Sequence, residues 1–439
     1  MTYARQAAFE ILTRMERSGA YSNLITEAKL RGVFHDNRDK ALASAIVCTV
    51  LERLITIDYN LSLYLEKPIE KLKPEVLTIL RIGACQLLYF DRIPASACVC
   101  ESVELARRNR LEYACSLMNA VLRKVAKNGL RLPEPSQGTL FASVKYSVPE
   151  DLYKLLCSAY GEQSANGILS EFHSKAPTYI RVNTLRCDTA RLSEALAREG
   201  IETKTVDICG NVLKLQPAVN PAATSAFSQG LYHVQDLSSQ LLCEAIAPAR
   251  GDIVFDMCAA PGGKSFTLAQ LMEGTGVLKA FEIHPSRVGL VKKGAERLGL
   301  QSLECAQGDS TVFDAAVGMA DEVLCDVPCS GLGAIRKKPE IRYKPLGNID
   351  NLRQLQYFIL CNSALYVKPG GLLVYSTCTL NPAENEHICE RFLQENPGYS
   401  IEKPAGKTLE TCCENGFVTI FPQQFHSDGF FFAMFRKAG

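Results

Sequence analysis

The amino-acid sequence predicts a multidomain protein with an all-α N-terminal domain, a small α+β middle domain and an α/β C-terminal domain. The chain has 439 residues, more than one hydrophobic core normally holds. Apolar residues repeat at helical spacing up to about residue 130, without an alternating strand pattern. Beyond residue 246, strand-like runs alternate with helical segments, as in a parallel sheet covered by helices. We therefore place the domains at residues 1–131, 132–245 and 246–439.

The N-terminal domain is predicted from a succession of helical segments. Ala41–Ile57 is strongly apolar, and Pro74 stands where it can open another helix. Residues 1–130 contain 19 Lys and Arg against 14 Asp and Glu. Much of this surplus lies in two clusters that could neutralise phosphate groups, although a solvated helix face explains them equally well. The clusters comprise Arg107, Arg108 and Arg110, and Arg123, Lys124 and Lys127.

The middle domain follows a predicted linker, Leu132–Ser147, in which proline, glycine and serine favour a connection over a regular element. Thr178–Leu185 has the pattern of a strand, and a helix is expected over Thr189–Glu199. Two further strands are expected at Gly210–Leu215 and Gly230–Val234. This mixture predicts a small α+β domain.

The C-terminal domain is predicted from a regular alternation of strands and helices. Near the end of the chain, Gly416–Phe421 and Gly429–Phe435 are expected to pair as antiparallel strands. The alternation predicts a Rossmann-like, doubly wound sheet. The other strands are expected near residues 253–257, 277–282, 303–307, 322–326 and 371–376, with helices that include 285–298 and 350–367.

A loop of small residues connects the first of these strands to a helix. The run Asp256–Ser265, DMCAAPGGKS, follows apolar residues and precedes helical ones. In a doubly wound sheet, the loop amides and the helix N-terminus at this turn face a ligand. Gly262 and Gly263 let the backbone approach that ligand closely. Glu282 ends the second strand, where an acid usually holds ribose hydroxyl groups, although a solvated acid is the alternative. The sequence therefore predicts a nucleoside-containing cofactor.

Other predicted strands also end in residues that could carry chemistry. Asp309 follows a short strand, where a turn aspartate is the simpler interpretation. Asp326 and Cys329 follow the strand at 322–326, and Cys378 follows the strand at 371–376. Parallel strands bring such ends to the edge of the sheet where ligands bind. Taken alone, Asp326 suits turn capping, and each cysteine suits a hydrophobic core better than a reactive site.

Three motifs together resemble the RNA cytosine-C5 methyltransferases that use S-adenosylmethionine. They are AAPGGK at residues 259–264, DVPCSG at 326–331 and STC at 376–378. The resemblance extends over nearly the whole chain and is most specific in the C-terminal half. It implies a NusB-like helical RNA-binding domain at the front and a Rossmann-like methyltransferase domain at the end. It also implies methylation of carbon 5 of one cytosine in 16S rRNA.

The resemblance assigns roles to the motif residues. It implies that Cys378 attacks carbon 6 of the cytosine and that Cys329 assists release of the product. Asp326 is implied to recognise the base, and Lys264 to support catalysis. A thiolate suits this chemistry because attack on carbon 6 makes carbon 5 nucleophilic, once the base has left its stack. The implied S-adenosylmethionine site comprises Cys258, Ala259, Ala260, Pro261, Gly262, Gly263, Lys264, Glu282, Asp309 and Asp326.

Two further segments are open to more than one interpretation. Arg181–Thr184, RVNT, matches the same family, and a packing or RNA-groove role is expected rather than chemistry. Arg336–Lys338 and Arg342, with Tyr343 beside them, follow the predicted site and suit a single-stranded RNA track. An ordinary solvated basic loop is the alternative.

Composition limits the class of protein. Hydrophobic residues make up 47% and charged residues 22%, which is ordinary for a soluble globular protein. The net charge is +1, so only a local patch can point to nucleic acid. The sequence shows neither a signal peptide nor a membrane-spanning apolar run. Its 18 cysteines contain no C-x-x-C pair, so we expect reduced thiols. We expect a cytoplasmic monomer that binds RNA and neither a metal nor a membrane.

Three other functions are compatible with parts of the sequence. The same chemistry could act on tRNA, although a NusB-like front domain favours rRNA by analogy. A catalytically silent RNA-binding assembly factor would need neither Cys329 nor Cys378. A dehydrogenase is disfavoured because the loop lacks the G-x-G-x-x-G pattern. Many relatives carry Asp where this chain has Glu282, whose longer side chain can still accept two ribose hydroxyl groups.

Overall fold

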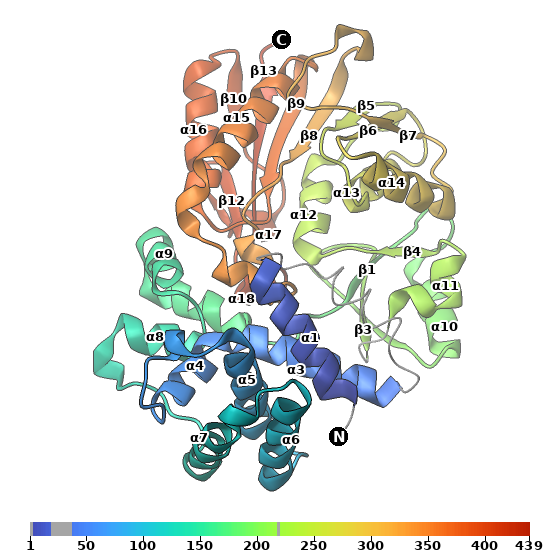
Figure 1. Cartoon of the computed structure of the whole chain (residues 1–439). Helices are drawn as coiled ribbons and strands as arrows, with labels where there is room; N and C mark the ends of the chain where they lie inside the picture. Colours follow the sequence, from blue (N-terminus) through green and yellow to red (C-terminus); the bar gives the residue numbers. More distant parts are fainter. Residues whose placement is uncertain (1–2, 19–36, 217–219) are drawn as a thin grey trace. The chain divides into compact units, whose positions relative to one another are not determined.

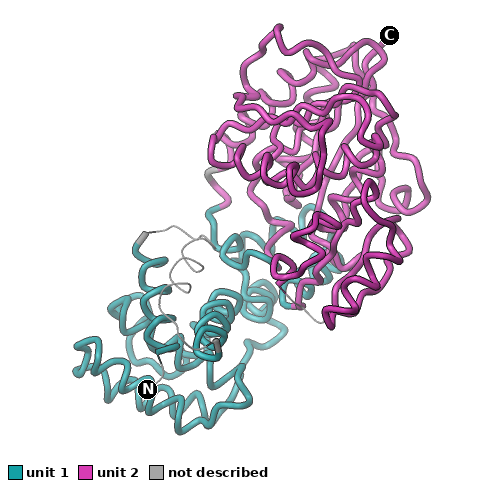
Figure 2. Tube along the Cα trace, turned by 90° about the vertical axis from the view of Figure 1, so that its right-hand side faces the viewer, with its two compact units in different colours: residues 1–173, 337–345 teal, residues 174–336, 346–439 magenta. Residues whose placement is uncertain are grey.

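The computed structural model describes residues 3–18, 37–216 and 220–439 (Figure 1). The chain forms two compact units, which Figure 2 distinguishes by colour. Unit 1 contains residues 1–173 and 337–345, and unit 2 contains residues 174–336 and 346–439. The predicted N-terminal domain also includes residues 1–2 and 19–36, which lie outside the described residues. Within the described ranges, no helix is long and apolar enough to cross a membrane.

Unit 1 is all-α wherever it is described, which confirms the fold class predicted for the N-terminal domain. Pro74 occupies the first turn of its helix, where no intrahelical amide bond is lost. The apolar run Ala41–Ile57 is divided between two helices, because the backbone of Arg53 at their junction is not helical. The helices are α1 (Tyr3–Ser18), α3 (Asn37–Glu52), α4 (Leu54–Ser62), α5 (Pro74–Tyr89), α6 (Ala95–Arg108), α7 (Cys115–Asn128), α8 (Thr139–Tyr146) and α9 (Glu150–Glu171).

The predicted linker is wrong in its second half, where α8 forms. Ala142 and Val144 of this helix are buried. The hydroxyl of Thr56 donates to the carbonyl of Val144 at 2.6 Å, and the amide of Ile55 donates to the hydroxyl of Ser147 at 3.1 Å. These bonds fasten α8 to α4. Neither partner is visible in the local sequence, which is why proline, glycine and serine there suggest a simple connection.

The predicted RNA track is also corrected by the structure. Arg342 belongs to a short 3-10 helix, η7 (Pro339–Tyr343), that packs within unit 1. Its guanidinium is 1% exposed and donates to the carbonyl of Glu52 at 2.8 Å. Arg336 is buried in unit 2, where it donates to the carbonyls of His426 and Ser427 at 2.7 and 2.8 Å. Both arginines are thus used to satisfy buried backbone carbonyls, so neither can follow an RNA strand.

Unit 2 contains a small antiparallel sheet with the strand order β2-β3-β1-β4. Arg181 is buried on β1 and forms a 2.6 Å ion pair with Glu244. The side-chain amide of Asn183 donates to the carbonyls of Gly230 and Leu298 at 2.8 and 2.9 Å. The RVNT segment therefore has the packing role. The elements are β1 (Tyr179–Val182), β2 (Glu202–Thr205), β3 (Val212–Gln216) and β4 (Tyr232–Val234), with α10 (Thr189–Arg198) and α11 (Ser225–Ser228).

The large sheet of unit 2 has the order β11-β12-β13-β9-β8-β5-β6-β7, and β10 pairs with β13. Strands β5 to β9 pair in parallel, and β10 to β13 add antiparallel strands. The predicted pairing of the last two strands is confirmed. The strands are β5 (Ile253–Asp256), β6 (Val277–Glu282), β7 (Leu303–Gln307), β8 (Ala320–Asp326), β9 (Val367–Thr377), β10 (Tyr399–Glu402), β11 (Cys413–Glu414), β12 (Phe417–Ile420) and β13 (Phe430–Lys437).

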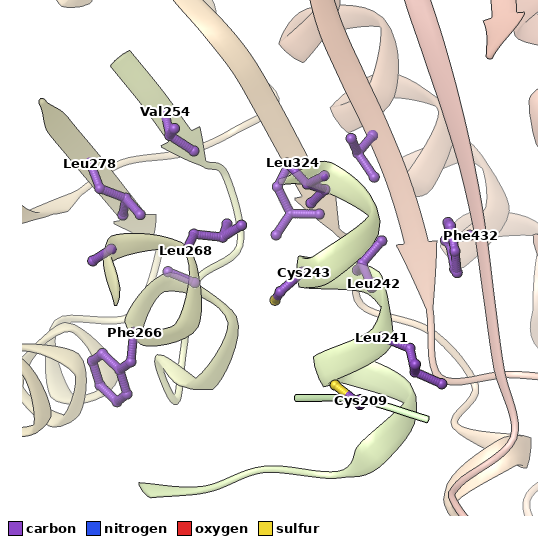
Figure 3. Packing of buried hydrophobic residues seen from close by; sticks show 14 of the residues in the cluster. Cys209, Leu241, Leu242, Cys243, Val254, Phe266, Leu268, Leu278, Leu324 and Phe432 are labelled. Carbon is purple, nitrogen blue, oxygen red and sulfur yellow. The ribbon is translucent and has the colours of Figure 1, made fainter. Parts of the chain in front are cut away.

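Helices cover both faces of the large sheet, as the doubly wound pattern predicts (Figure 1). On one face, Leu242 and Leu268 pack with Val254 in the core shown in Figure 3. On the other face, Phe255 packs with Leu360. Neighbouring residues of β5 thus enter opposite cores, because side chains alternate along a strand. The helices are α12 (Leu237–Ile246), α13 (Gly263–Leu271), α14 (Pro285–Leu298), α15 (Asp350–Ala364), α16 (Glu386–Glu395), α17 (Lys407–Glu410) and α18 (Pro422–Phe425).

Two acidic side chains meet near the beginning of the central strands. Burial and the neighbouring carboxylate of Asp252 raise the pKa of Glu322 from 4.5 to about 8, and the two side chains share a hydrogen bond. Glu322 is therefore protonated in the folded protein near neutral pH. Below pH 4.5 the unfolded chain holds the same proton. As the pH rises from there to 8, the unfolded chain ionises first, so the stability contributed by this group is progressively lost.

We expect Glu322→Gln to raise the melting temperature by a few degrees at pH 9 and to change it little at pH 4.5. The amide keeps a hydrogen-bond donor toward Asp252 but cannot ionise. Scanning calorimetry at both pH values measures the effect, with Glu304→Gln on exposed β7 as the control. Equal shifts at the two pH values would show that Glu322 does not titrate in this way.

Candidate active site

The carboxyl ends of three neighbouring parallel strands lie at one edge of the large sheet. β5 ends at Asp256, β8 ends at Asp326, and β9 ends one residue before Cys378. The strand order reverses between β5 and β8, since β6 and β7 extend the sheet in one direction and β9 in the other. Doubly wound sheets bind ligands at such a reversal. The topology therefore brings together the strand ends that the sequence singles out.

The loop between β5 and α13 is shaped by its backbone and its glycines. The amide of Ala259 donates to the carbonyl of Phe281 at 2.9 Å, which ties the loop to β6. Gly262 has a φ of 110°, and a side chain at this position would overlap the ring of Phe266. Glycine is thus required for both conformation and space. Because α13 begins at Gly263, the amides of its first turn lie at this edge and have no intrahelical partner.

A pocket of ≈ 200 Å³ opens beside the loop. Seven residues of the predicted cofactor site line it, and Gln235 and Asp236 add polar groups from the segment before α12. Gly262 shapes the loop without lining the pocket. The lining residues are Val234, Gln235, Asp236, Ser239, Asp256, Cys258, Ala259, Ala260, Pro261, Gly263, Lys264 and Asp326.

Glu282 and Asp309 lie beyond this lining, near the ends of β6 and β7. Glu282 is 5% exposed and accepts a hydrogen bond from the amide of His284 at 3.0 Å. Its other oxygen pairs with Arg287 at 3.2 Å. Asp309 is exposed and accepts hydrogen bonds from the hydroxyl and amide of Thr311, which lower the pKa of Asp309. Asp309 thus closes its own turn, and a place for either acid in a cofactor site stays a prediction.

Asp256 is a buried acid at the pocket that the motifs alone do not indicate. It ends β5 as Asp326 ends β8, and this shared position is the sequence signal that could reveal it. Its carboxylate accepts a hydrogen bond from the hydroxyl of Ser265 at 2.6 Å. Burial raises the pKa of Asp256 from 3.8 to about 6, against that hydrogen bond and with a contribution from Asp326. Asp256 therefore changes its charge just below neutral pH.

Lys264 and Asp326 form an ion pair between the loop and the end of β8. The Lys264 Nζ lies 2.6 Å from Oδ2 of Asp326 and 5.1 Å from the centre of the Phe430 ring. The hydroxyl of Ser376 donates to Oδ1 of Asp326 at 2.8 Å from the neighbouring strand β9. Burial opposes the charge on Lys264, but the ion pair with Asp326 outweighs burial and raises the pKa of Lys264. The pair therefore keeps a lysine cation and an aspartate anion at the pocket.

Cys329 and Cys378 meet beside this ion pair, with their sulfur atoms 3.2 Å apart. Both side chains are partly exposed. A hydrogen bond from the Cys329 thiol lowers the pKa of Cys378 from the ordinary 9.0, against burial and the charge of Asp326. The same hydrogen bond, with burial, raises the pKa of Cys329 well above 9.0. Both shifts in pKa favour the thiolate at Cys378 and the proton on Cys329.

The fold and the site define a Rossmann-like methyltransferase domain, and comparison with known families agrees. Residues 243–436 match the family described as 16S rRNA methyltransferase RsmB/F. Residues 2–127 match the NusB family, and residues 148–221 match the ferredoxin-like domain of RsmF/B-like methyltransferases. These matches confirm the predicted fold class of all three parts.

Relatives extend this similarity along the whole chain. The probable ribosomal RNA small subunit methyltransferase B of Bacillus subtilis is 34% identical over 450 residues, covering 100% of this chain and 99% of the relative. That of Synechocystis is 33% identical over 453 residues, covering 100% of both. Among solved structures, PH0851 has the same fold, with a TM-score of 0.81, 24% identity and 98% of both chains covered. The chain belongs to the ribosomal RNA small subunit methyltransferase B family and is an RNA methyltransferase.

The hydrogen bond between the two thiols can be measured without any substrate. We expect the rate of Cys378 alkylation by iodoacetamide to have its pH midpoint below 9.0. In Cys329→Ala the midpoint should rise, because the donor that stabilises the Cys378 thiolate is gone. Mass spectrometry of the Cys378 peptide measures the rate at each pH, and Cys361→Ala is the control. An unchanged midpoint in Cys329→Ala would contradict the hydrogen bond.

Proposed function

We propose that this protein transfers a methyl group from S-adenosylmethionine to carbon 5 of a cytosine in 16S rRNA through a covalent Cys378–cytosine intermediate. The observation that carries the proposal is the pair of sulfur atoms 3.2 Å apart, beside the Lys264–Asp326 ion pair. RNA methylation on oxygen or on an exocyclic nitrogen needs no thiolate. A silent assembly factor would need none either, so the paired thiols favour chemistry on a ring carbon.

The residues around the pocket fit S-adenosylmethionine. Asp236, Asp256 and Asp326 line it, and an acidic lining suits the sulfonium and ammonium cations of this cofactor. The free amides at the start of α13 suit its carboxylate. Glu282 lies on the adjoining strand end and could accept the ribose hydroxyl groups once Arg287 moves aside. When bound, S-adenosylmethionine supplies a methyl group on a positively charged sulfur.

Cys378 begins the reaction as a thiolate. Its sulfur forms a bond to carbon 6 of the cytosine, and the ring electrons move to the ring nitrogen N3, which takes a proton from a water molecule. Asp326 then stabilises the protonated N3 and the exocyclic amine, while Lys264 and Ser376 hold its carboxylate in position. Each Asp326 oxygen accepts one of these hydrogen bonds and keeps a second acceptor site for the base. Carbon 5 is now nucleophilic and takes the methyl group.

Cys329 assists the second half of the reaction. A water molecule removes the proton from carbon 5, and the electrons of that bond restore the double bond between carbons 5 and 6. The bond from carbon 6 to sulfur breaks, and Cys378 leaves as a thiolate. The thiol of Cys329 donates a hydrogen bond to this leaving thiolate, across the 3.2 Å that separates the two sulfur atoms in the free protein. N3 returns its proton to water, which restores the atoms and charges of the site.

Unit 1 supports the proposed RNA substrate. Residues 2–127 match the NusB family, and we propose that this part of unit 1 binds rRNA. Arg107 and Arg108 lie in the last turn of α6 and are more than half exposed. Glu104 neutralises part of their charge through ion pairs of 3.7 and 3.3 Å. Exposed pairs of this kind are weak, so phosphate groups can compete for the arginines.

Replacement of the two cysteines should impair different steps of the reaction. Cys378→Ala should lose about 10³-fold or more in turnover and form no adduct, because the nucleophile is absent. Cys329→Ala should still attack but release the product slowly, and should accumulate a covalent protein–RNA species. A denaturing gel detects the adduct on 16S rRNA or tRNA, and bisulfite sequencing locates the methyl group. Cys361→Ala is the control. An adduct in Cys378→Ala and none in Cys329→Ala would reverse the two roles.

The arginines of α6 should contribute to RNA affinity through phosphate contacts. We expect replacement of Arg107, Arg108 and Arg110 by Ala to make the plot of log affinity against log salt concentration less steep, with the magnitude of its slope reduced by about two to three. Filter binding of 16S rRNA between low and physiological salt measures the slope. Arg250→Ala, which removes an exposed ion-paired arginine from unit 2, serves as the control. Identical slopes for the triple variant and the unmodified protein would show that these arginines form a solvated helix face and do not contact RNA phosphates.

A further inference from the structure

A buried carboxylate in the segment that follows Cys378 holds the loop that carries Cys329. Glu384 ends the 3-10 helix η9 (Pro382–Glu384), which follows Cys378, and its side chain is 0% exposed. Its Oε2 accepts hydrogen bonds from the amide of Ser330 at 2.8 Å and from the side chain of Gln356 at 3.0 Å. Its Oε1 accepts from the hydroxyl of Ser330 at 2.5 Å and from Asn381 at 3.1 Å. Four neutral donors thus converge on this carboxylate.

These contacts hold both neighbours of Cys329 in the chain, Pro328 and Ser330. Ser330 follows Cys329 directly and gives both its amide and its hydroxyl to Glu384. Pro328 precedes Cys329, and its carbonyl accepts a 2.9 Å hydrogen bond from the same Gln356 amide that reaches Glu384. The Ser330 hydroxyl also lies 2.7 Å from that of Thr379, the residue after Cys378. The two cysteine loops are therefore joined through one buried anchor.

We propose that Glu384 is a positioning residue that holds the Cys329 thiol against Cys378 and so sets the rate of product release. A carboxylate suits this place because it accepts four hydrogen bonds and donates none. A glutamine has the same size, but its amide would meet one of the four donors with a donor of its own. The mechanistic part of the proposal rests on the function proposed above, and the positioning part can be tested without it.

The first test measures position through the alkylation of Cys378. In Glu384→Gln the pH midpoint of Cys378 alkylation should rise, as in Cys329→Ala, because the Cys329 thiol moves away. Loss of the Glu384 charge alone would lower the pKa of the neighbouring thiols, since Glu384 raises that of Cys329. The direction of the shift therefore separates position from charge. The charges of Asp326, Lys264 and Asp428 that also act on Cys378 are the same in every variant.

Ser330→Ala and Glu386→Gln complete the set. Ser330→Ala removes one of the four donors without changing any charge, so it should raise the pH midpoint of Cys378 alkylation by a smaller amount. If Glu384→Gln fails to fold, this variant tests the positioning role in its place. Glu386→Gln alters a partly buried glutamate two residues further along, which accepts a 3.5 Å hydrogen bond from the hydroxyl of Thr419, and should change nothing. Unchanged midpoints in both Glu384→Gln and Ser330→Ala would overturn the positioning role.

The second test measures release with 16S rRNA and S-adenosylmethionine. Glu384→Gln should lower turnover about ten- to a hundredfold, the cost of a small misplacement at a reacting centre, with little change in KM. It should also accumulate the covalent adduct on a denaturing gel, whereas a merely destabilised protein should not. If Cys329→Ala forms an adduct and Glu384→Gln does not, the release role of Glu384 is wrong. If neither forms an adduct while the alkylation midpoints move, the proposed function fails and the positioning role stands.

Discussion

The parallel pairing of β5, β8 and β9 is the constraint on which the site depends. Its register sets Asp256 beside Leu324 and Asp326 beside Ser376. Asp326 can therefore reach the loop after β5 on one side and a hydroxyl of β9 on the other. A shift of one residue in this pairing would turn Asp326 to the opposite face of the sheet. The ion pair, the pocket and the two cysteine loops all follow from this register.

Electrostatics gives the site its chemical character. Lys264 and Asp326 keep their charges because each compensates the other in a place that water reaches poorly. Asp256 lies next to them without a cation of its own in hydrogen-bonding contact, and burial raises its pKa toward neutrality. A hydrogen bond joins the sulfur atoms of Cys329 and Cys378, and it lowers the pKa of Cys378 while it raises that of Cys329. The arrangement thus places a carboxylate, a thiol of lowered pKa and a thiol of raised pKa within a few side chains.

Neutral hydrogen bonds set the positions of these charged groups. Gln356 and Asn381 are buried amides that direct their N–H groups at Glu384. Close backbone packing adds to this, since the amide of Gly333 donates to the carbonyl of Cys378 at 2.9 Å. A side chain at Gly333 would overlap the backbone of Gly429. Apart from the carboxylate of Glu384, the groups that hold the cysteine loops therefore carry no formal charge.

The sequence by itself determined the parts of this protein that depend on local pattern. Strands β5 to β8 and helix α14 lie where strand-like apolar runs and helical spacing place them, because central strands are buried on both faces and a covering helix on one. The strand ends of the parallel sheet identify Asp326 and Cys378 for the same reason. Gly262 is required by a left-handed backbone that its loop imposes locally.

Tertiary structure decided the role of every group whose partners are distant in the chain. Arg342 looks like a basic loop residue, but it satisfies the carbonyl of Glu52, which lies 290 positions earlier. α8 forms where turn-forming residues suggest a linker, because α4 supplies its hydrogen bonds. Glu384 becomes an anchor only because Ser330 and Gln356, from distant parts of the chain, donate hydrogen bonds to it. The residue type determines charge and hydrogen-bonding capacity, whereas burial and hydrogen-bond partners are determined only when the chain has folded.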